Sequence, residues 1–282
     1  MSAPTTLRTE SADGVRTVVF SRPDEYNTIT PALRDELAAA IDEADADDGI
    51  RAILLRAEGK AFCAGYGLGW STEAQAAEKN AERVWDSVQD MALIGSFVDV
   101  YMKLWYCRKP TIAAVQGWCI GGGTDMALCA DLILAAESAS FGYPPARVWG
   151  TPTTAMWVHR LGFQQAKRWL FTGDEIRAHD AQRIGLALEV VPDAELEQRA
   201  SELATRIARL PLNQLVMLKA LCNQPAEAMG LAASRRLGTL FDGVARHTQE
   251  GLDFVQRAEQ AGFRQAVRER DDPFGDYGSR AR

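Results

Sequence analysis

Two glycine-rich corners of the sequence could present bare backbone amides to a ligand. Residues 57–68 read AEGKAFCAGYGL and residues 116–132 read QGWCIGGGTDMALCADL, and each corner follows an apolar run. Small residues beyond the carboxyl end of a strand lie where α/β sheets bind ligands, and a helix that begins there adds the positive end of its dipole. Two amides that converge on one oxygen form an oxyanion hole, where one donor typically contributes about 3–4 kcal/mol to a transition state. Alternatively, the glycines only allow close packing of helix against strand.

Glycine-rich turns also occur in nucleotide-binding and serine-hydrolase sites, but this sequence matches the motifs of those sites poorly. Residues 65–70 (GYGLGW) have glycine at the first, third and fifth positions, whereas a dinucleotide fingerprint has it at the first, third and sixth. The chain has no GxxxxGK[ST] phosphate loop and no GxSxG nucleophile elbow. Its three histidines, His159, His179 and His247, are scattered, so we expect no metal site.

The composition is that of an ordinary folded protein with reduced thiols. The chain has 282 residues, of which 47% are hydrophobic, and a formal net charge of −7, which disfavours a nucleic-acid partner. Its five cysteines form no CxxC pair, and no apolar run is long enough for a membrane span or a secretory signal. We therefore expect a cytoplasmic protein without a membrane partner. Residues 263–282 mix both charge signs and are interpreted as a solvated surface.

The elements expected around the two corners alternate between strand and helix. Apolar or β-branched runs predict buried strands at residues 15–20, 52–56, 111–115 and 131–136. Thr30 is a plausible N-cap, with Pro31 as the first residue of a helix. This helix would bury four residues spaced three or four apart, namely Leu33, Leu37, Ile41 and Ala44. The alternation indicates βαβ units and a mainly parallel sheet, which is an α/β fold.

Helical sequence dominates the rest of the chain. Residues 72–107 predict a long helical insertion, and strand signals vanish after about residue 195. We therefore expect an α/β core over residues 1–198, which includes the insertion, followed by a helical region over residues 199–282.

The motifs and their order resemble the crotonase superfamily, which includes enoyl-CoA hydratases and isomerases. Residues 59–68 and 113–150 resemble the two signature segments of the family. Residues 22–30 (RPDEYNTIT) resemble its first acyl-CoA loop, and residues 172–192 resemble the segment after the active site. The resemblance covers roughly residues 10–260. It implies a crotonase-type ββα spiral core with a C-terminal helical region involved in trimerisation.

The resemblance also implies how a substrate is held. Crotonases bind the thioester carbonyl of an acyl-CoA between two backbone amides and stabilise an enolate. By motif position, these amides belong to Tyr66 and Gly122. Residues beside them are assigned to substrate binding, namely Ala64, Gly65, Leu68 and Gly121. Coenzyme A is part of the substrate, and no separate cofactor is implied.

The acids differ from the family pattern. Enoyl-CoA hydratases use two glutamates, one to handle water and one to handle a proton on carbon. Here the first position is Asp125 and the second is Pro145, which carries no proton. Residues 151–154 also lack the aspartate that related dienoyl-CoA isomerases and the chlorobenzoyl-CoA dehalogenase place further along. Asp125 is a candidate general base or acid, or else a carboxylate that stabilises a helix N-terminus. Tyr66 and Tyr143 are candidate proton donors, or else packing residues.

Further candidates surround the expected acyl-CoA. Arg22 and Lys60 could meet the phosphates of CoA, or else lie on a solvated surface. Trp149 and Trp157 are candidates to shape the acyl pocket, with ordinary core packing as the alternative.

The expected helices carry four more candidates. Asp86 and Asp90 on the insertion could reach a pocket, although surface exposure is the interpretation we favour. Phe254 and Lys219 are candidates to cover the CoA of the same or an adjacent subunit. The resemblance implies a homotrimer or hexamer, and the Ala/Leu-rich tail is consistent with such an interface.

The resemblance thus implies an enoyl-CoA hydratase/isomerase that acts on an acyl-CoA thioester. The replacement of the second glutamate by Pro145 leaves the exact reaction open. Two alternatives remain. One is a crotonase-fold hydrolase of a ring-bearing or diketone substrate, and the other is a catalytically silent acyl-CoA binder.

Overall fold

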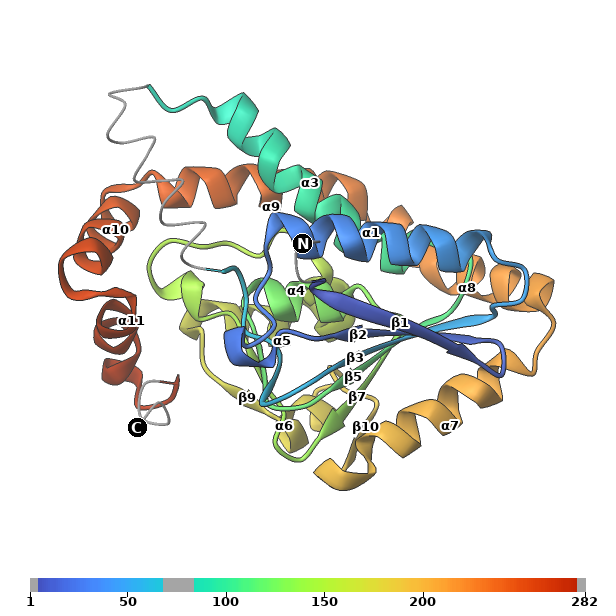
Figure 1. Cartoon of the computed structure of the whole chain (residues 1–282). Coiled ribbons are helices and arrows are strands. Elements are labelled where there is room, and N and C mark those ends of the chain that lie inside the picture. Colours follow the sequence, from blue (N-terminus) through green and yellow to red (C-terminus); the bar gives the residue numbers. More distant parts are fainter. Residues whose placement is uncertain (1–4, 68–83, 278–282) are drawn as a thin grey trace.

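The computed structural model describes residues 5–67 and 84–277, and its centre is a six-stranded sheet (Figure 1). The strand order is β1-β2-β3-β5-β7-β10, in which β1 and β2 form an antiparallel hairpin and the other neighbours are parallel. The four strands expected from the apolar runs are β2, β3, β5 and β7. The strands of this sheet are β1 (Leu7–Ala12), β2 (Val15–Phe20), β3 (Ala52–Ala57), β5 (Thr111–Val115), β7 (Leu132–Ala136) and β10 (Glu189–Val191).

A second, four-stranded sheet collects the short strands that follow β3, β5 and β7. Its order is β4-β6-β8-β9, with only the β8–β9 pair antiparallel. Its strands are β4 (Ala61–Cys63), β6 (Trp118–Ile120), β8 (Ser140–Gly142) and β9 (Ile176–Arg177). The chain therefore repeats a strand of the first sheet, a strand of the second sheet and a helix, which is the ββα spiral that the resemblance implies.

Helices account for most of the remaining described chain. The α-helices are α1 (Pro31–Ala46), α3 (Ser87–Tyr106), α4 (Gly122–Leu128), α5 (Met156–Thr172), α6 (Ala178–Arg183), α7 (Leu196–Ala208), α8 (Leu212–Ala228), α9 (Leu231–Arg246), α10 (Gln249–Ala261) and α11 (Phe263–Asp271). Short 3-10 helices are η1 (Pro23–Glu25), η2 (Pro144–Arg147), η3 (Asp193–Glu195) and η4 (Asp272–Phe274).

Helix α1 begins and packs as the sequence predicts. The Thr30 hydroxyl accepts a hydrogen bond of 3.2 Å from the Leu33 amide, and Pro31 occupies the first helical position. Such a cap satisfies one of the amides that a helix start leaves without a partner, and is typically worth about 1 kcal/mol. The buried face consists of Leu33, Leu37, Ala40, Ile41 and Ala44.

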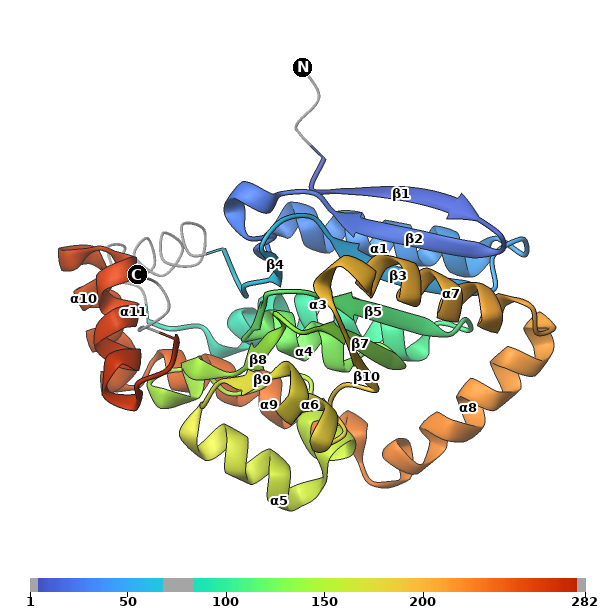
Figure 2. The same ribbon diagram turned by 90° about the horizontal axis from the view of Figure 1, so that it is seen from below.

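The two faces of the large sheet are covered by different layers (Figures 1 and 2). Helix α7 lies along one face, where its small buried residues Ala200, Ala204 and Ala208 pack on strand side chains such as Leu54 and Ile112. The other face joins the main core, which includes residues from α1, α3 and α4 and from the second sheet. The two glycine-rich corners lie in this second sheet and beside it, since the first contains β4 and the second contains β6 and α4.

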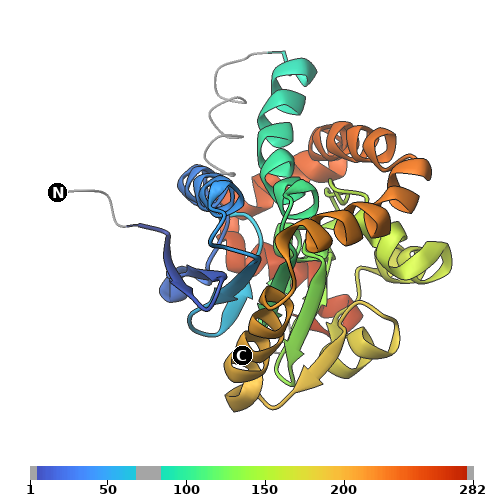
Figure 3. The same ribbon diagram turned by 90° about the vertical axis from the view of Figure 1, so that its right-hand side faces the viewer.

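The C-terminal helices wrap around this core. Helices α8 and α9 lead the chain from the end of α7 across the molecule to α10 and α11, which lie at the opposite end (Figures 1 and 2). Helix α3 extends beyond the sheet in Figure 3, and α9 packs along it. The strand-free tail predicted from the sequence is therefore present as helices from Leu196 onward.

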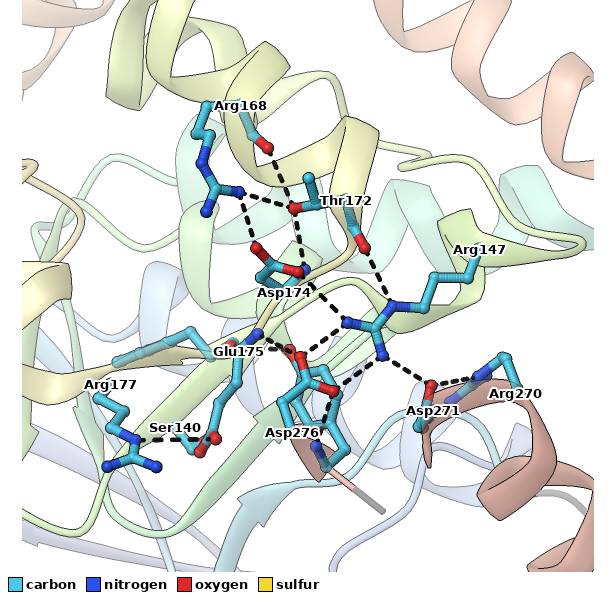
Figure 4. A network of polar contacts seen from close by, with 12 residues as sticks. Ser140, Arg147, Arg168, Thr172, Asp174, Glu175, Arg177, Arg270, Asp271 and Asp276 are labelled. Carbon is cyan, nitrogen blue, oxygen red and sulfur yellow. Dashed lines mark hydrogen bonds and ion pairs between the residues drawn. The ribbon is translucent and has the colours of Figure 1, made fainter. Parts of the chain in front are cut away.

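A buried arginine ties the C-terminal segment back to the core (Figure 4). The Arg147 guanidinium, at the end of η2, lies 3.0 Å from the Asp271 carboxylate and 2.7 Å from the Asp276 carboxylate. Its Nη2 also lies 3.5 Å from Asp174, and its Nε donates to the Thr172 carbonyl at 3.0 Å. The interpretation of residues 263–282 as solvated surface is therefore wrong for Asp271, which is fully buried because it faces this guanidinium.

Some expectations concern residues outside the described ranges. The part of the helical insertion at residues 72–83 is among them, whereas α3 accounts for residues 87–106 of that prediction. The boundary at residue 198 falls within α7 and stays a prediction. Within residues 5–67 and 84–277, no helix is long and apolar enough to cross a membrane.

Candidate active site

The two glycine-rich corners lie against each other because β4 and β6 are adjacent parallel strands. Gly65 has a φ of +92°, and a Cβ atom there would lie 3.0 Å from the Ile120 carbonyl oxygen. A Cβ atom at Gly123 would lie 2.1 Å from the Cys63 carbonyl oxygen. Glycine at these positions therefore permits the close approach of the corners, and the packing role that the sequence left open applies at Gly123.

The backbone amides of Tyr66 and Gly122 are available at this junction. Tyr66 and Ile29 form an isolated parallel bridge. The Ile29 amide donates to the Gly65 carbonyl at 2.9 Å, and the Ile29 carbonyl accepts from the Gly67 amide at 2.8 Å. The Tyr66 amide therefore faces away from Ile29. Gly122 is the first residue of α4, where an amide has no partner within the helix. Across the described chain, neither amide donates a hydrogen bond to a protein acceptor.

The Tyr66 ring covers the glycine of the second corner. A Cβ atom at Gly122 would lie 2.8 Å from Cε2 of Tyr66, so a side chain there would displace the ring. The ring packs edge-on against Phe97, with centroids 5.5 Å apart, and its hydroxyl lies 3.2 Å from the Tyr101 hydroxyl. Burial, as the largest cause, raises the pKa of Tyr66, so its phenol is neutral at physiological pH.

Asp125 lies in the first turn of α4 and is 1% exposed. Its Oδ2 accepts hydrogen bonds from the Thr153 amide at 2.7 Å and the Thr153 hydroxyl at 3.1 Å, and its Oδ1 accepts from Trp157 Nε1 at 2.9 Å. Burial raises the pKa of Asp125 to about 6, the hydrogen bonds from Thr153 and Trp157 oppose that rise, and the charge of Asp242 adds to it. This carboxyl can therefore change protonation state near neutral pH.

Tyr143 and Pro145 border the same site. The Tyr143 hydroxyl donates to the Thr151 carbonyl at 2.8 Å, and its ring packs edge-on against Trp157. Burial raises the pKa of Tyr143 well above its ordinary value. Pro145 Cγ would lie 3.7 Å from a Cβ atom at Gly121, whose φ is +58°. Pro145, where the resemblance would place a glutamate, is thus next to the amide corner and carries no acid.

The residues assigned to CoA and to the acyl pocket lie in different settings. The Arg22 guanidinium contacts Glu25 and the Thr28 carbonyl within its own loop, whereas Lys60 is exposed. The Ala64 amide donates to the Tyr26 carbonyl at 3.1 Å, which fixes the first corner. Leu68 lies outside the described residues.

The candidate aromatic residues are divided between surface and core. Trp149 is partly buried, and its ring centroid lies 5.9 Å from that of Phe254 on α10. Trp157 is 1% exposed, so it belongs to the core and also holds Asp125. The Lys219 ammonium binds the Leu104 and Lys109 carbonyls and the Asp131 carboxylate inside the protein.

Sequence reasoning missed a buried charge cluster beside these residues. Arg246 on α9 lies 2.8 Å from the Asp90 carboxylate of α3 and 3.1 Å from the Asp242 carboxylate of its own helix. The expected exposure of Asp90 is therefore wrong, because Arg246 binds it in the helix interface, whereas Asp86 is exposed and caps α3. The only local signal was the i, i+4 spacing of Asp242 and Arg246. Among the described residues, no group of three His, Cys, Asp or Glu side chains could hold a metal ion.

Known proteins resemble this chain in sequence and in fold. The family model for enoyl-CoA hydratase/isomerase matches residues 10–265. A crystal structure of an enoyl-CoA hydratase from Mycobacterium smegmatis is 44% identical, covers 97% of this chain and 95% of that chain, and has a TM-score of 0.91. An enoyl-CoA hydratase/isomerase structure from Xanthobacter autotrophicus Py2 is 28% identical, with coverage of 96% and 99% and a TM-score of 0.85.

A curated relative from Rhodobacter capsulatus, named a probable enoyl-CoA hydratase, is 32% identical over 209 residues, which are 73% of this chain and 76% of the relative. The chain therefore belongs to the enoyl-CoA hydratase/isomerase family and has the α/β crotonase fold.

Proposed function

We propose that this protein converts an acyl-CoA thioester through an enolate held by the backbone amides of Tyr66 and Gly122. The observation that carries the proposal is the pair of amides at two adjoining corners, which have no acceptor among residues 5–67 and 84–277, with a buried Asp125 on the same short helix as Gly122. When a proton leaves C2, the carbon next to the thioester carbonyl, negative charge grows on the carbonyl oxygen. Two fixed donors stabilise that charge more strongly than they stabilise the neutral carbonyl.

Asp125 is the group proposed to move the proton at this carbon. Burial raises the pKa of Asp125 to about 6, which places it near the pH where a general base or acid works best. Oδ1 accepts a single donor, Trp157 Nε1, so one of its lone pairs has no partner in the described residues. The bonds from Thr153 hold the other oxygen and fix the orientation of the carboxyl group.

The test is a panel of CoA esters incubated with the protein and analysed by mass spectrometry. A mass gain of one water indicates hydration, fragments indicate a hydrolase, and unchanged masses with a changed ultraviolet spectrum indicate a double-bond isomerase. Asp125→Asn should lower turnover about 10²- to 10⁴-fold, because proton transfer by a positioned group contributes that much. Asp99→Asn, an exposed acid on α3, serves as the control and should retain activity. Tight binding with no conversion of any ester would contradict the proposal and favour a silent binder.

Lys60 and Arg22 are proposed to contact the phosphates of CoA. Lys60 is supported by its exposed position directly before the first corner, although Arg22 already contacts Glu25. Lys60→Ala should raise KM several-fold and leave kcat nearly unchanged, because a phosphate contact binds substrate and transition state alike. An unchanged KM would remove Lys60 from the substrate site.

We also propose that the chains assemble as a trimer or a pair of trimers through the C-terminal helices. Large apolar side chains on α8 and α9 are exposed in the single chain, among them Met217, Leu221, Leu237 and Phe241. Exposed apolar surface of this kind favours association. Light scattering should give the mass of three or six chains, and a monomer at micromolar concentration would contradict the assignment.

A further inference from the structure

A cluster of three buried charged side chains lies between α3 and α9. Arg246 Nη2 contacts both carboxylate oxygens of Asp90 at 2.8 Å, and Arg246 Nε contacts Asp242 Oδ2 at 3.1 Å. A Cβ atom at Gly243 would lie 2.2 Å from Asp90 Oδ2, so glycine leaves the space that this carboxylate occupies. Two acids share one cation in a site from which water is largely excluded, so the two charges are not fully compensated.

Residues 151–153 connect this cluster to Asp125. The Thr153 amide donates to Asp125 at 2.7 Å, and the Thr151 hydroxyl at the other end of the segment contacts α9, the helix that carries Asp242. Two residues of chain span at most about 7 Å, so Asp125 and helix α9 contact nearby positions of one short segment.

Helix α9 is fixed closely against this segment. The Thr151 hydroxyl donates to the Gly238 carbonyl at 3.3 Å, and a Cβ atom at Gly238 would lie 2.6 Å from the Pro152 carbonyl oxygen. The Tyr143 hydroxyl donates to the Thr151 carbonyl, and its ring packs edge-on against Trp157, which donates to Asp125. Asp242 follows Gly238 by four residues, so it lies on the same face of α9, one turn along from the segment that holds Asp125.

We propose that Asp242 is the second proton-transfer group of this active site and fills the role left vacant by Pro145, with Arg246 and Asp90 as its positioning residues. The inference rests on the proposed enolate chemistry and deepens it to the addition of water to a 2-enoyl thioester. Asp242 can take this role because Arg246 Nε binds one of its oxygens, Oδ2, and a carboxylate has further lone pairs that can accept a hydrogen bond from water.

One water molecule adds across each double bond. The water oxygen forms a bond to C3, and Asp242 takes the proton that leaves this water. The electron pair of the double bond moves to the thioester oxygen between the Tyr66 and Gly122 amides. Asp125, in its protonated form, then delivers a proton to C2 as the enolate collapses. One proton passes from Asp242 back to Asp125 between turnovers, so neither carboxyl group is consumed.

The charges around Asp242 suit a pair of carboxyls that exchange a proton. Burial raises the pKa of Asp242 to about 6, Arg246 opposes that rise, and Asp90 adds to it. Asp242 contacts Arg246 on the same helix, and Arg246 also binds Asp90 on α3. Burial raises the pKa of Tyr66 and of Tyr143, and the charges of Asp125 and Asp242 add to both rises. The hydration rate should therefore have a bell-shaped pH profile centred near pH 6, because it needs one carboxyl protonated and the other ionised.

The experiment measures two reactions on each variant and compares their ratio. The first is hydration of crotonyl-CoA, and the second is exchange of the C2 protons of butyryl-CoA in deuterated water, followed by mass spectrometry. Exchange needs the amide pair and Asp125 but adds no water. The ratio of the two rates is independent of the folded fraction of the sample.

Asp242→Asn should lower hydration about 10²-fold or more while C2 exchange stays within about threefold of the wild type. Asp242→Glu keeps a charge for Arg246 and should give a hydration rate between those of the wild type and Asp242→Asn. Asp99→Asn removes the exposed ion pair with Arg235 between the same two helices, so it is the matched control and should change neither rate.

Two results would overturn the role of Asp242 alone. One is a ratio of hydration to exchange in Asp242→Asn that equals the wild-type ratio. The other is a wild-type protein that exchanges C2 protons but adds no water to crotonyl-CoA. A wild type that catalyses neither reaction would instead refute the proposed enolate chemistry, and the inference with it.

Discussion

Two buried charge clusters of this molecule use the same residue types with opposite consequences. In the Arg147 cluster, one guanidinium contacts Asp174, Asp271 and Asp276 at the junction of η2 and the C-terminal segment (Figure 4). Burial alone would raise the pKa of Asp276, but the hydrogen bonds and charge of Arg147 lower it below its ordinary value. Asp276 therefore stays ionised to a lower pH than an ordinary aspartate does.

In the Asp242 cluster, the balance is reversed. Burial raises the pKa of both Asp125 and Asp242 to about 6, and at Asp242 the charge and hydrogen bond of Arg246 do not offset that rise. Acids with lowered pKa values hold a structure together, whereas acids poised near neutral pH can pass protons. The Arg147 cluster is thus a structural anchor, whereas Asp125 and Asp242 have pKa values suited to proton transfer.

The largest expected effect concerns the anchor. Arg147→Leu removes the cation from among buried carboxylates and should lower the free energy of unfolding by about 3–5 kcal/mol. Arg168→Leu is the matched control, because Arg168 also contacts Asp174, at 2.8 Å, but is half exposed. It should cost about 1 kcal/mol or less. Urea unfolding measures both, and equal losses would show that the buried network is not an anchor.

The pH dependence of stability should have opposite signs in the two clusters. The pKa of Asp242 is raised on folding, so its stabilising contribution is present below about pH 4 and is lost as the pH rises through about 6. Asp242→Asn removes this pH dependence. Between pH 4 and pH 8, the free energy of unfolding of the wild type should therefore fall by on the order of 3 kcal/mol relative to that of the variant.

The pKa of Asp276 is lowered on folding, so its contribution is present above about pH 4 and is lost at lower pH. Asp276→Asn should then cost most stability above pH 4 and progressively less below it. Urea unfolding across the pH range measures both variants, and parallel curves would remove the distinction between the clusters.

Part of this comparison could be predicted from the sequence, and part could not. The Thr30 cap, the apolar strands and the two corners depend on residues close together in the chain, so spacing and residue type suffice to predict them. Asp90 and Arg246 are 156 residues apart, and Arg147 and Asp271 are 124 apart. Such pairs leave no periodic signal, which is why Asp90 and Asp271 were both expected on the surface. Asp242 was missed for the same reason.

The smallest expected effect concerns the tuning of Asp125. Trp157 Nε1 donates to its carboxylate and so lowers its pKa against the larger effect of burial. Trp157→Phe should raise the pKa of Asp125 by roughly 1 unit, because a hydrogen bond to a charged group is worth about 1.5–3 kcal/mol. The ionised form takes the C2 proton, so the acid limb of the exchange rate should move to higher pH. An unmoved limb would mean that another group takes that proton.

The central claim is that two backbone amides hold one thioester oxygen. A crystal structure of the protein with butyryl-CoA tests it most directly. We expect the thioester oxygen to lie about 2.7–3.1 Å from both the Tyr66 and the Gly122 nitrogen. A carbonyl that binds elsewhere, or a Tyr66 ring that still fills the space beside Gly122 in the complex, would contradict it.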